Sequence, residues 1–366
     1  MKGGVAMFAW IFAYWWLLLI ESLVVAGVMG LLALNANRLV GNTPTSLAAL
    51  KGSMALTALV TVVAYFALII GIAKYLGVVG DQLVIGAMIL SAGLVVLQWL
   101  ISPWLINTLY RTREPATHRE RILEAIVNRI AERSGIGGVK VRIADLRMPN
   151  AFAYSSPLAG KYVAFTKGLL DLLSEDEVEA VAAHEIGHLK HRDVSWILAL
   201  SIIPLVVYFM GRILIFTGLL GGGDRRREEG NPLILAAIGA ALLALSIVFR
   251  FLIAHFNRLR EYYADAHSAL TTGRPRSLQR ALAKIYIAVK RSPTEAVKSS
   301  FAAPLFIVAP LVEVSGGMLV DIDDIVETLK YEEESPLMEL FSTHPPISKR
   351  LRFLDRLSLY SGGYSG

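Results

Sequence analysis

The stretch AHEIGHLKHRD, residues 183–193, places three histidines and two acidic side chains within eleven residues. On an α-helix, His184 and His188 lie one turn apart on the same face, so both imidazoles can reach one zinc ion at about 2.0–2.1 Å. Glu185 lies beside them, and in the H-E-x-x-H pattern this glutamate can take a proton from water as a general base. The spacing indicates a hydrolytic zinc site, but the pattern also arises by chance and needs a third ligand.

A third ligand is available in FNRLREYYADAHSAL, residues 256–270, where Glu261 and Asp265 are four residues apart and share a helix face. Glu261 can bind the metal and leave the fourth tetrahedral position open, which is typical of catalytic zinc. Asp265 can accept a hydrogen bond from a ligand histidine and fix its orientation. The alternative is a solvated charged helix in which Arg258 and Arg260 pair with these carboxylates.

His191 is a second candidate for the third ligand. A straight helix places it about 10 Å along the axis from His184, and no glycine turns the chain back between them. We therefore interpret His191 as a polar helix residue. The chain has no cysteine, which excludes thiolate zinc ligands and a cysteine nucleophile.

The composition indicates an integral membrane protein, because the chain is 55% hydrophobic and its mean hydropathy is +0.54. A membrane-spanning helix needs about 20 apolar residues. Five runs approach or exceed this length, and we read the first as a retained helix rather than a cleaved signal peptide. They are residues 7–34, 54–73, 83–106, 194–220 and 233–254.

The order of these runs predicts four parts: amino-terminal membrane helices (1–110), a first protease segment (111–193), a membrane hairpin (194–255) and a second protease segment (256–366). The two polar segments lie on the same side, because the hairpin crosses twice. Arginines follow the third and fifth runs, which favours a cytoplasmic location for both segments, although three arginines in the hairpin loop oppose it. The net charge of +6 is explained by such flanking residues, and we expect no nucleic-acid partner.

The first polar segment has an α+β pattern. Residues 117–135 have helical periodicity and end at a glycine, and the runs VKVRIADL, NAFAYS and KYVAFT predict a small three-stranded sheet. Ser174 and Glu177 form a capping-box pattern. We expect the helix that follows to contain the H-E-x-x-H residues and to continue directly into the fourth apolar run.

Four stretches, NAFAY (150–154), VAAHEIGHLKHRD (181–193), NRLREYYAD (257–265) and STHPPISKRLRFL (342–354), together resemble the HtpX-type membrane zinc metalloproteases, relatives of the CAAX prenyl endopeptidases. The resemblance covers residues 111–355. It implies a mainly α integral membrane protein, with a helical transmembrane bundle and an α+β, gluzincin-like domain that contains a small β-sheet. It also implies one Zn²⁺ per chain on His184, His188 and Glu261, with Glu185 as base and Asp265 as supporting partner.

The resemblance further implies that Asn150 and the strand after it, Ala151, Phe152 and Ala153, line the substrate cleft. It implies that His344 helps to stabilise the oxyanion, whereas the sequence alone allows a turn residue before two prolines. Related chains usually have two spans before the protease segment, and three are predicted here. We interpret the apolar stretch 306–320 as core packing or a lid over the cleft rather than a further span.

The predicted function is a zinc endopeptidase in the plasma membrane that cleaves polypeptides at the cytoplasmic face. The resemblance suggests stress-related quality control of misfolded membrane proteins. One alternative is a CAAX-type endopeptidase for prenylated substrates, for which five spans enclose too small a chamber. A second is a membrane scaffold or transporter that binds metal without catalysis. The sequence does not give the natural substrate or the oligomeric state.

Overall fold

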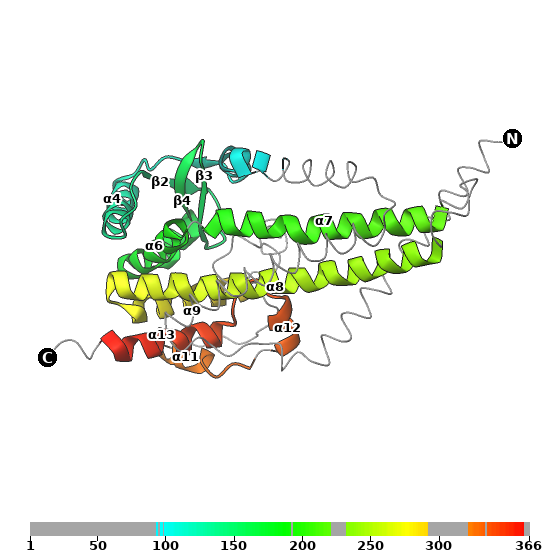
Figure 1. The fold of residues 1–366 in the computed structure, drawn as a ribbon. Coiled ribbons are helices and arrows are strands. Elements are labelled where there is room, and N and C mark those ends of the chain that lie inside the picture. Colours follow the sequence, from blue (N-terminus) through cyan, green and yellow to red (C-terminus); the bar gives the residue numbers. More distant parts are fainter. Residues whose placement is uncertain are drawn as a thin grey trace. The chain divides into compact units, whose positions relative to one another are not determined.

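The structure is a computed structural model of the chain, and it describes residues 93, 96–97, 99–191, 193–220, 232–291, 321–333 and 335–361. Within these residues the fold is mostly helical, with one small mixed sheet (Figure 1). They divide into two compact units, one with residues 198–253 and the other with residues 96–197 and 254–361. The predicted spans at 7–34 and 54–73, the hairpin loop and the stretch 306–320 lie outside the described residues.

The sheet belongs to the second unit and has four strands in the order β1-β2-β4-β3. β2 and β4 are parallel, whereas β1 pairs with β2, and β3 with β4, in antiparallel fashion. The expected count of three strands is wrong, because β1 is only two residues long and leaves no recognisable alternation. The strands are β1 (Thr112–Arg113), β2 (Val139–Ala144), β3 (Ala151–Ser156) and β4 (Gly160–Thr166).

Alternation along the strands gives the sheet two different apolar faces. Val141, Val163 and Phe165 point into the main core, together with helical residues. The other face carries an aromatic cluster of Phe152, Tyr154 and Tyr162, which the helical segment 99–109 and Tyr110 cover. β3 is the last strand in the sheet, so one of its edges has no strand beside it within the described residues.

Two helices of the second unit begin with a capping box. Thr117 and Glu120 cap α4 (His118–Arg133), which ends before Gly135 in the left-handed region, as the sequence predicts. Ser174 and Glu177 cap α6 (Glu175–Lys190), which confirms that prediction. The expectation that α6 continues into the fourth apolar run is wrong, because α6 ends at Lys190 and a separate helix begins at Asp193.

The remaining helices of the second unit complete its core around α6. α9 packs against α6, and α11 and α13 pack against α9. Val326 and Leu351 are fully buried there. These helices are α5 (Lys167–Leu172), α9 (Pro275–Arg291), α11 (Ile322–Leu329), α12 (Pro336–Phe341) and α13 (Ile347–Ser361).

The long helices α7 (Asp193–Leu220) and α8 (Pro232–Thr272) cover the fourth and fifth predicted spans. In the first unit they approach closely, since a Cβ on Gly211 would lie 2.8 Å from the carbonyl oxygen of Gly239. Among the described residues, α8 is the one helix long and apolar enough to cross a membrane, and α7 contains a shorter apolar helix, Pro204–Phe216. A crossing by either helix remains a prediction.

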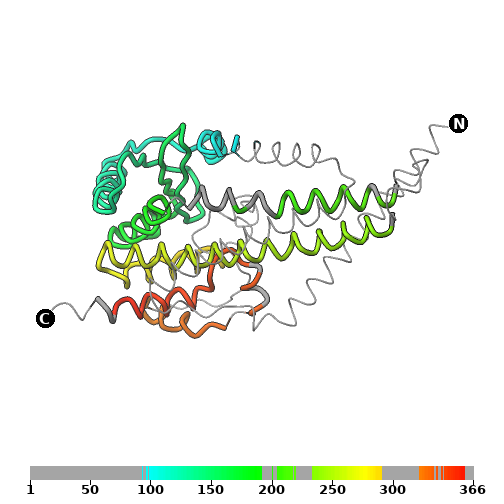
Figure 2. The backbone as a smooth tube through the Cα atoms, viewed as in Figure 1, coloured from blue at the N-terminus to red at the C-terminus, as the bar shows by residue number. Residues whose placement is uncertain are grey.

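α8 is too long to lie wholly within a bilayer. Its 41 residues run without a break (Figure 2) and extend about 60 Å at 1.5 Å per residue, about twice the ~30 Å of a hydrocarbon core. The apolar part ends near residue 254, and the turns that follow carry Arg258, Arg260, Glu261 and Asp265. The polar end of α8 belongs to the second unit, where α6 also lies.

Candidate metal centre

The metal-ligand candidates from α6 and α8 meet at one point inside the second unit. The Nε2 atoms of His184 and His188 are 3.2 Å apart. One carboxylate oxygen of Glu261 lies 3.6 Å from Nε2 of His184, and the other lies 3.5 Å from Nε2 of His188. Two nitrogens bound to one zinc ion at about 2.0–2.1 Å in tetrahedral geometry would be about 3.3 Å apart, so the arrangement fits a zinc ion.

A second observation supports the fit. Within the described residues, no hydrogen bond reaches Oε2 of Glu261, although this carboxylate oxygen is buried. The nearest cation, Arg350, has its Nη1 atom 3.6 Å from this oxygen, so a metal ion would supply the direct contact that the buried charged oxygen lacks. Three residues, His184, His188 and Glu261, form the group that could hold a metal ion in the described part of the chain, and His191 is not in it.

A glycine allows the two helices to approach closely at this point. Gly187 lies between the two histidines on α6, and a Cβ there would lie 3.1 Å from Cβ of His267 and 3.2 Å from Cα of Ala264, both on α8. These are tight contacts, so any larger residue would push α6 and α8 apart. The glycine in A-H-E-I-G-H therefore serves packing rather than chemistry.

Asp265, the predicted supporting partner, lies beside His184. Its Oδ1 atom lies 3.0 Å from Nδ1 of His184, and both side chains are buried. Burial alone would lower the pKa of His184, but the neighbouring carboxylates of Asp265 and Glu261 raise it to about 9. Because Nδ1 faces a carboxylate, Nε2 is left for a metal.

Arg350 of α13 holds Asp265 in place, and sequence reasoning missed it. Its Nε donates to Oδ2 of Asp265 at 2.8 Å and its Nη2 donates to Oδ1 at 2.6 Å, a two-point contact in which both residues are almost fully buried. Nη1 lies 3.6 Å from Glu261. Burial would raise the pKa of Asp265, but Arg350 and His184 lower it, so the carboxylate stays charged.

Nothing in the sequence distinguishes Arg350. It lies among Lys349 and Arg352, a pattern that usually indicates an exposed basic helix face. Its position six residues after His344, in a stretch that carries the family resemblance, was the available signal.

Glu185 is buried next to the histidines. Burial raises the pKa of its carboxyl above the ordinary value, while His184 and His188 oppose that rise. The backbone N–H of Ala153, on β3, donates a hydrogen bond to it. A carboxyl with a raised pKa is suited to accept a proton and then return it near neutral pH.

His344 lies on the opposite side of Glu261, in the loop before α13. Its Nε2 is 4.0 Å from Oε1 of Glu261, and its Nδ1 is 3.1 Å from Oγ1 of Thr343. Burial lowers the pKa of His344 to about 4, despite the opposing effect of Glu261, so the imidazole is neutral near pH 7. Arg258 fixes the loop by donating to the carbonyl oxygen of Ser342 at 2.8 Å.

The predicted substrate-lining residues lie at the start of β3. The backbone of Asn150 faces β4, since its N–H donates to Thr166 Oγ1 at 2.8 Å. Ala151 and Ala153 contact the main core, on the side of α6. The side chain of Phe152 points to the other face, where its ring lies 5.0 Å from that of Tyr110. The side chain of Phe152 therefore lies on the opposite face of the sheet from Ala151 and Ala153.

His191 lies apart from the three candidate ligands. It caps the end of α6, and its ring lies edge-on to Tyr263, with 4.0 Å between centroids. This agrees with its interpretation as a polar residue rather than a ligand.

A family model described as Peptidase family M48 matches residues 117–358. The chain is 54% identical over 318 residues to a protein named Protease HtpX homolog from Aeropyrum pernix, which covers 85% of this chain and 99% of that protein. This chain belongs to the HtpX-type M48 metalloproteases. As an M48 family member it is a metalloprotease that acts on polypeptides, and the family resemblance is confirmed.

Other relatives extend the similarity. Protease HtpX homolog 2 from Saccharolobus solfataricus is 38% identical over 322 residues, which is 85% of this M48 chain and 98% of that protein. Among solved structures, the crystal structure of S. mikatae Ste24p is 17% identical with a TM-score of 0.49, and the match covers 82% of this chain and 66% of that chain.

Proposed function

We propose that this M48 metalloprotease is a membrane-embedded endopeptidase that holds one zinc ion on His184, His188 and Glu261. The observation that carries the proposal is the convergence of their ligand atoms within 4.8 Å of one another, next to the buried Glu185. The donor set of two imidazoles and one carboxylate is that of a catalytic zinc site with one open position.

Zinc in this site supplies Lewis acidity, which polarises the scissile carbonyl and acidifies water. Glu185 accepts a proton from the attacking water and passes it to the nitrogen of the leaving amine. The raised pKa of Glu185, caused by burial, brings its proton affinity closer to what both transfers need. Asp265 keeps the His184 ring in place, and Arg350 keeps Asp265 in place.

His344 stabilises the oxygen on which negative charge develops. In the tautomer whose Nδ1 accepts from Thr343, Nε2 carries the proton and faces the Glu261 side of the site. A preorganised donor at this position acts on the transition state rather than on the bound peptide. Asn150 and the edge of β3, from Ala151 to Ala153, bind the substrate as an added strand.

The location of the enzyme is also a proposal. The apolar part of α8 and the predicted runs support a multi-pass protein, and the arginines after the third and fifth runs support a cytoplasmic catalytic domain. Substrates presented at the bilayer surface, such as misfolded membrane proteins, suit a site on a helix that continues from an apolar segment.

The test is cleavage of an unstructured protein by the detergent-purified, zinc-loaded chain. Glu185→Gln should keep bound zinc and lose about 10³-fold or more in kcat/KM. Glu175→Gln is the matched control, because Glu175 is an exposed residue at the start of the same helix. A chelated sample should be inactive and recover with zinc.

Two results would contradict the proposal. Full activity of Glu185→Gln would show that Glu185 is not the catalytic base and would favour a metal-binding protein without this chemistry. Cleavage confined to prenylated peptides would favour the CAAX-type alternative, so a matched pair of prenylated and unmodified peptides belongs in the assay.

A further inference from the structure

The backbone groups of β3 alternate between β4 and the open edge of the sheet. The N–H of Thr166 donates to the carbonyl of Asn150 at 3.0 Å, which fixes the phase of the pairing. Ala151, Ala153 and Ser155 then direct their backbone groups toward the open edge. The hydrogen bond from the N–H of Ala153 to Glu185 agrees with this phase.

The outward carbonyl of Ser155 is already occupied. It accepts a hydrogen bond from the indole Nε1 of Trp99 at 3.0 Å. Trp99 lies 56 residues before Ser155 in sequence and belongs to the helical segment 99–109. An extended peptide added to this edge can pair with Ala151 and with the carbonyl of Ala153, whose N–H donates to Glu185, but it meets the indole at Ser155.

The helical segment is fixed to the sheet near Trp99. The hydroxyl of Tyr154 donates to Oδ1 of Asn107 at 2.5 Å, and the rings of Tyr110 and Phe152 lie 5.0 Å apart. These contacts are on the buried aromatic face of the same strand. The indole is therefore held against β3 by several contacts.

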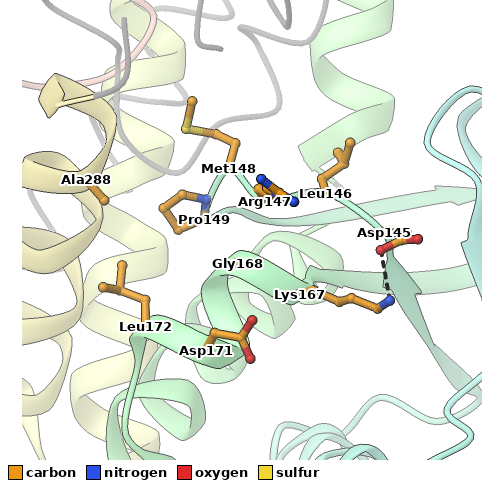
Figure 3. Close-up of a pocket in the computed structure, with 10 residues that line it drawn as sticks. All are labelled: Asp145, Leu146, Arg147, Met148, Pro149, Lys167, Gly168, Asp171, Leu172 and Ala288. Atoms are coloured by element: carbon orange, nitrogen blue, oxygen red, sulfur yellow. Dashed lines mark ion pairs between the residues drawn. The ribbon is translucent and has the colours of Figure 1, made fainter.

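At the other end of this edge, no strand of the described residues pairs with β3. Before Asn150 the chain runs through Met148 and Pro149, which line a cavity of about 600 Å³ together with residues of α5 (Figure 3). Gly168 makes room for this loop, because a Cβ there would lie 1.8 Å from the carbonyl oxygen of Arg147. A peptide that leaves β3 at Ser155 meets Trp99, whereas at the other end the chain before Asn150 lines a cavity.

We propose that Trp99 ends the substrate-binding edge at Ser155 and so limits how many residues on one side of the scissile bond the enzyme binds. The inference rests on the proposed function, because Glu185 places the scissile bond near Ala153. A substrate in the more stable antiparallel pairing has its amino-terminal part toward Ser155. Since outward residues alternate, Ser155 faces the residue two positions before the one opposite Ala153.

The experiment uses two series of quenched peptides with one fixed cleavage site, extended stepwise toward either terminus. With the zinc-loaded wild type, kcat/KM should rise over about the first two amino-terminal residues and then stay constant, because the third residue faces the occupied carbonyl of Ser155. Carboxyl-terminal extension should continue to raise it over more residues. This result needs no variant, so a folding defect cannot obscure it.

Trp99→Phe keeps the aromatic ring and frees the Ser155 carbonyl. The third amino-terminal residue, which faces Ser155, should then raise kcat/KM by about 3- to 10-fold, mainly through a lower KM, which is the effect of one added hydrogen bond. Trp104→Phe is the matched control, because Trp104 is half-exposed on the same segment, and its profile should equal that of the wild type. Binding of the same peptides to Glu185→Gln, followed by fluorescence anisotropy, should show the same change with length.

Several outcomes would overturn the inference. One is a wild-type kcat/KM that keeps rising with amino-terminal length. Another is a Trp99→Phe variant whose dependence on peptide length equals that of the wild type. A third is a plateau of kcat/KM in the carboxyl-terminal series. Each of them leaves zinc-dependent cleavage intact and so spares the proposed function. If the folded, zinc-loaded wild type cleaves no peptide in either series, the proposed function fails and this inference fails with it.

Discussion

The two histidines of the candidate metal centre differ in what surrounds them, although they come from one helix. Nδ1 of His184 faces Asp265, which Arg350 clamps from the other side. Nδ1 of His188 lies 3.3 Å from Nη2 of Arg260, a cation, and the His188 side chain is 12% exposed against 1% for His184. The site thus combines a fixed half supported by negative charge with a more open half flanked by positive charge.

This difference indicates a division of roles. A carboxylate behind a ligand histidine increases its basicity and fixes its ring, whereas a cation does the opposite. We expect His184 to anchor the metal and His188 to lie toward the more accessible side of the site. Damage to the two halves should therefore have unequal consequences.

The largest effect is expected from breaking the fixed half. Asp265→Asn removes the charge that pairs with a buried arginine, and leaving one partner of such a pair costs about 3–5 kcal/mol of unfolding free energy. It should also weaken zinc binding about 10- to 100-fold. Thermal unfolding and chelator competition measure the two quantities. Asp324→Asn, at an exposed position on α11, is the control.

A double variant separates the two effects. Asp265→Asn combined with Arg350→Met leaves no unpaired buried charge, so much of the lost stability should return. Zinc affinity should stay low, because the carboxylate behind His184 is still missing. If zinc affinity returned together with stability, Asp265 would act only through the fold, and the comparison of the two halves would lose its basis.

The second prediction concerns the glycine between the two halves. Gly187→Ala adds a methyl group in tight contact with His267 and Ala264, which should cost about 1–3 kcal/mol of stability and move both histidines relative to Glu261. Zinc affinity should fall as well. Gly137→Ala is the matched control, because its Cβ would meet nothing within 4 Å. Unchanged zinc affinity in Gly187→Ala would mean that α6 and α8 can separate without disturbing the ligands.

The third prediction tests the open half. Arg260→Gln removes the cation beside Nδ1 of His188 and leaves a shorter, uncharged polar side chain. Because a cation lowers the basicity of the neighbouring imidazole, zinc affinity should stay within about threefold of the wild type or rise. Chelator competition measures it. A tenfold loss of zinc affinity would mean that Arg260 helps to hold the metal site together. The proposed difference between the His184 and His188 sides of the site would then not hold.

Much of the candidate metal centre could be predicted from the sequence, because its residues lie at short, characteristic spacings within single helices. His184, Glu185 and His188, and the pair Glu261 and Asp265, each depend on one helical turn. Arg350 could not be found in this way, since its contact with Asp265 joins α13 to α8 across 85 residues.

The same contrast holds for the fold. The helices α4 and α6 and the three longer strands are predicted by periodicity and caps, whereas the two-residue β1, the break after Lys190 and the helices α9, α11, α12 and α13 are not. β1 exists only through its pairing with β2, and at the break the ring of His191 packs edge-on against Tyr263 of α8. Long-range contacts of this kind leave no local pattern.

The smallest effect is expected at an acidic–basic pair far less enclosed than Asp265 and Arg350. Glu120 accepts from Nη1 of Arg113 at 2.9 Å and from the backbone N–H of Thr117 at 3.0 Å in the capping box of α4. The contact with Arg113 lowers the pKa of Glu120 from 4.5 to about 2, although burial opposes it. Since Arg113 is 38% exposed, we expect Glu120→Gln to cost only about 1–2 kcal/mol near pH 7.

The pH dependence follows from the direction of that shift. A carboxyl whose pKa is lower in the folded state stabilises the fold above its unfolded pKa of 4.5, and this contribution is lost as the pH falls toward 2. The difference in unfolding free energy between wild type and Glu120→Gln should therefore be largest at pH 7 and should shrink between pH 4.5 and 3. Denaturant unfolding at these pH values measures it. A difference that does not change with pH would assign the loss to the capping geometry and not to the charge. The charge of Glu120 would then contribute little to stability, unlike the charge of Asp265 at the metal centre.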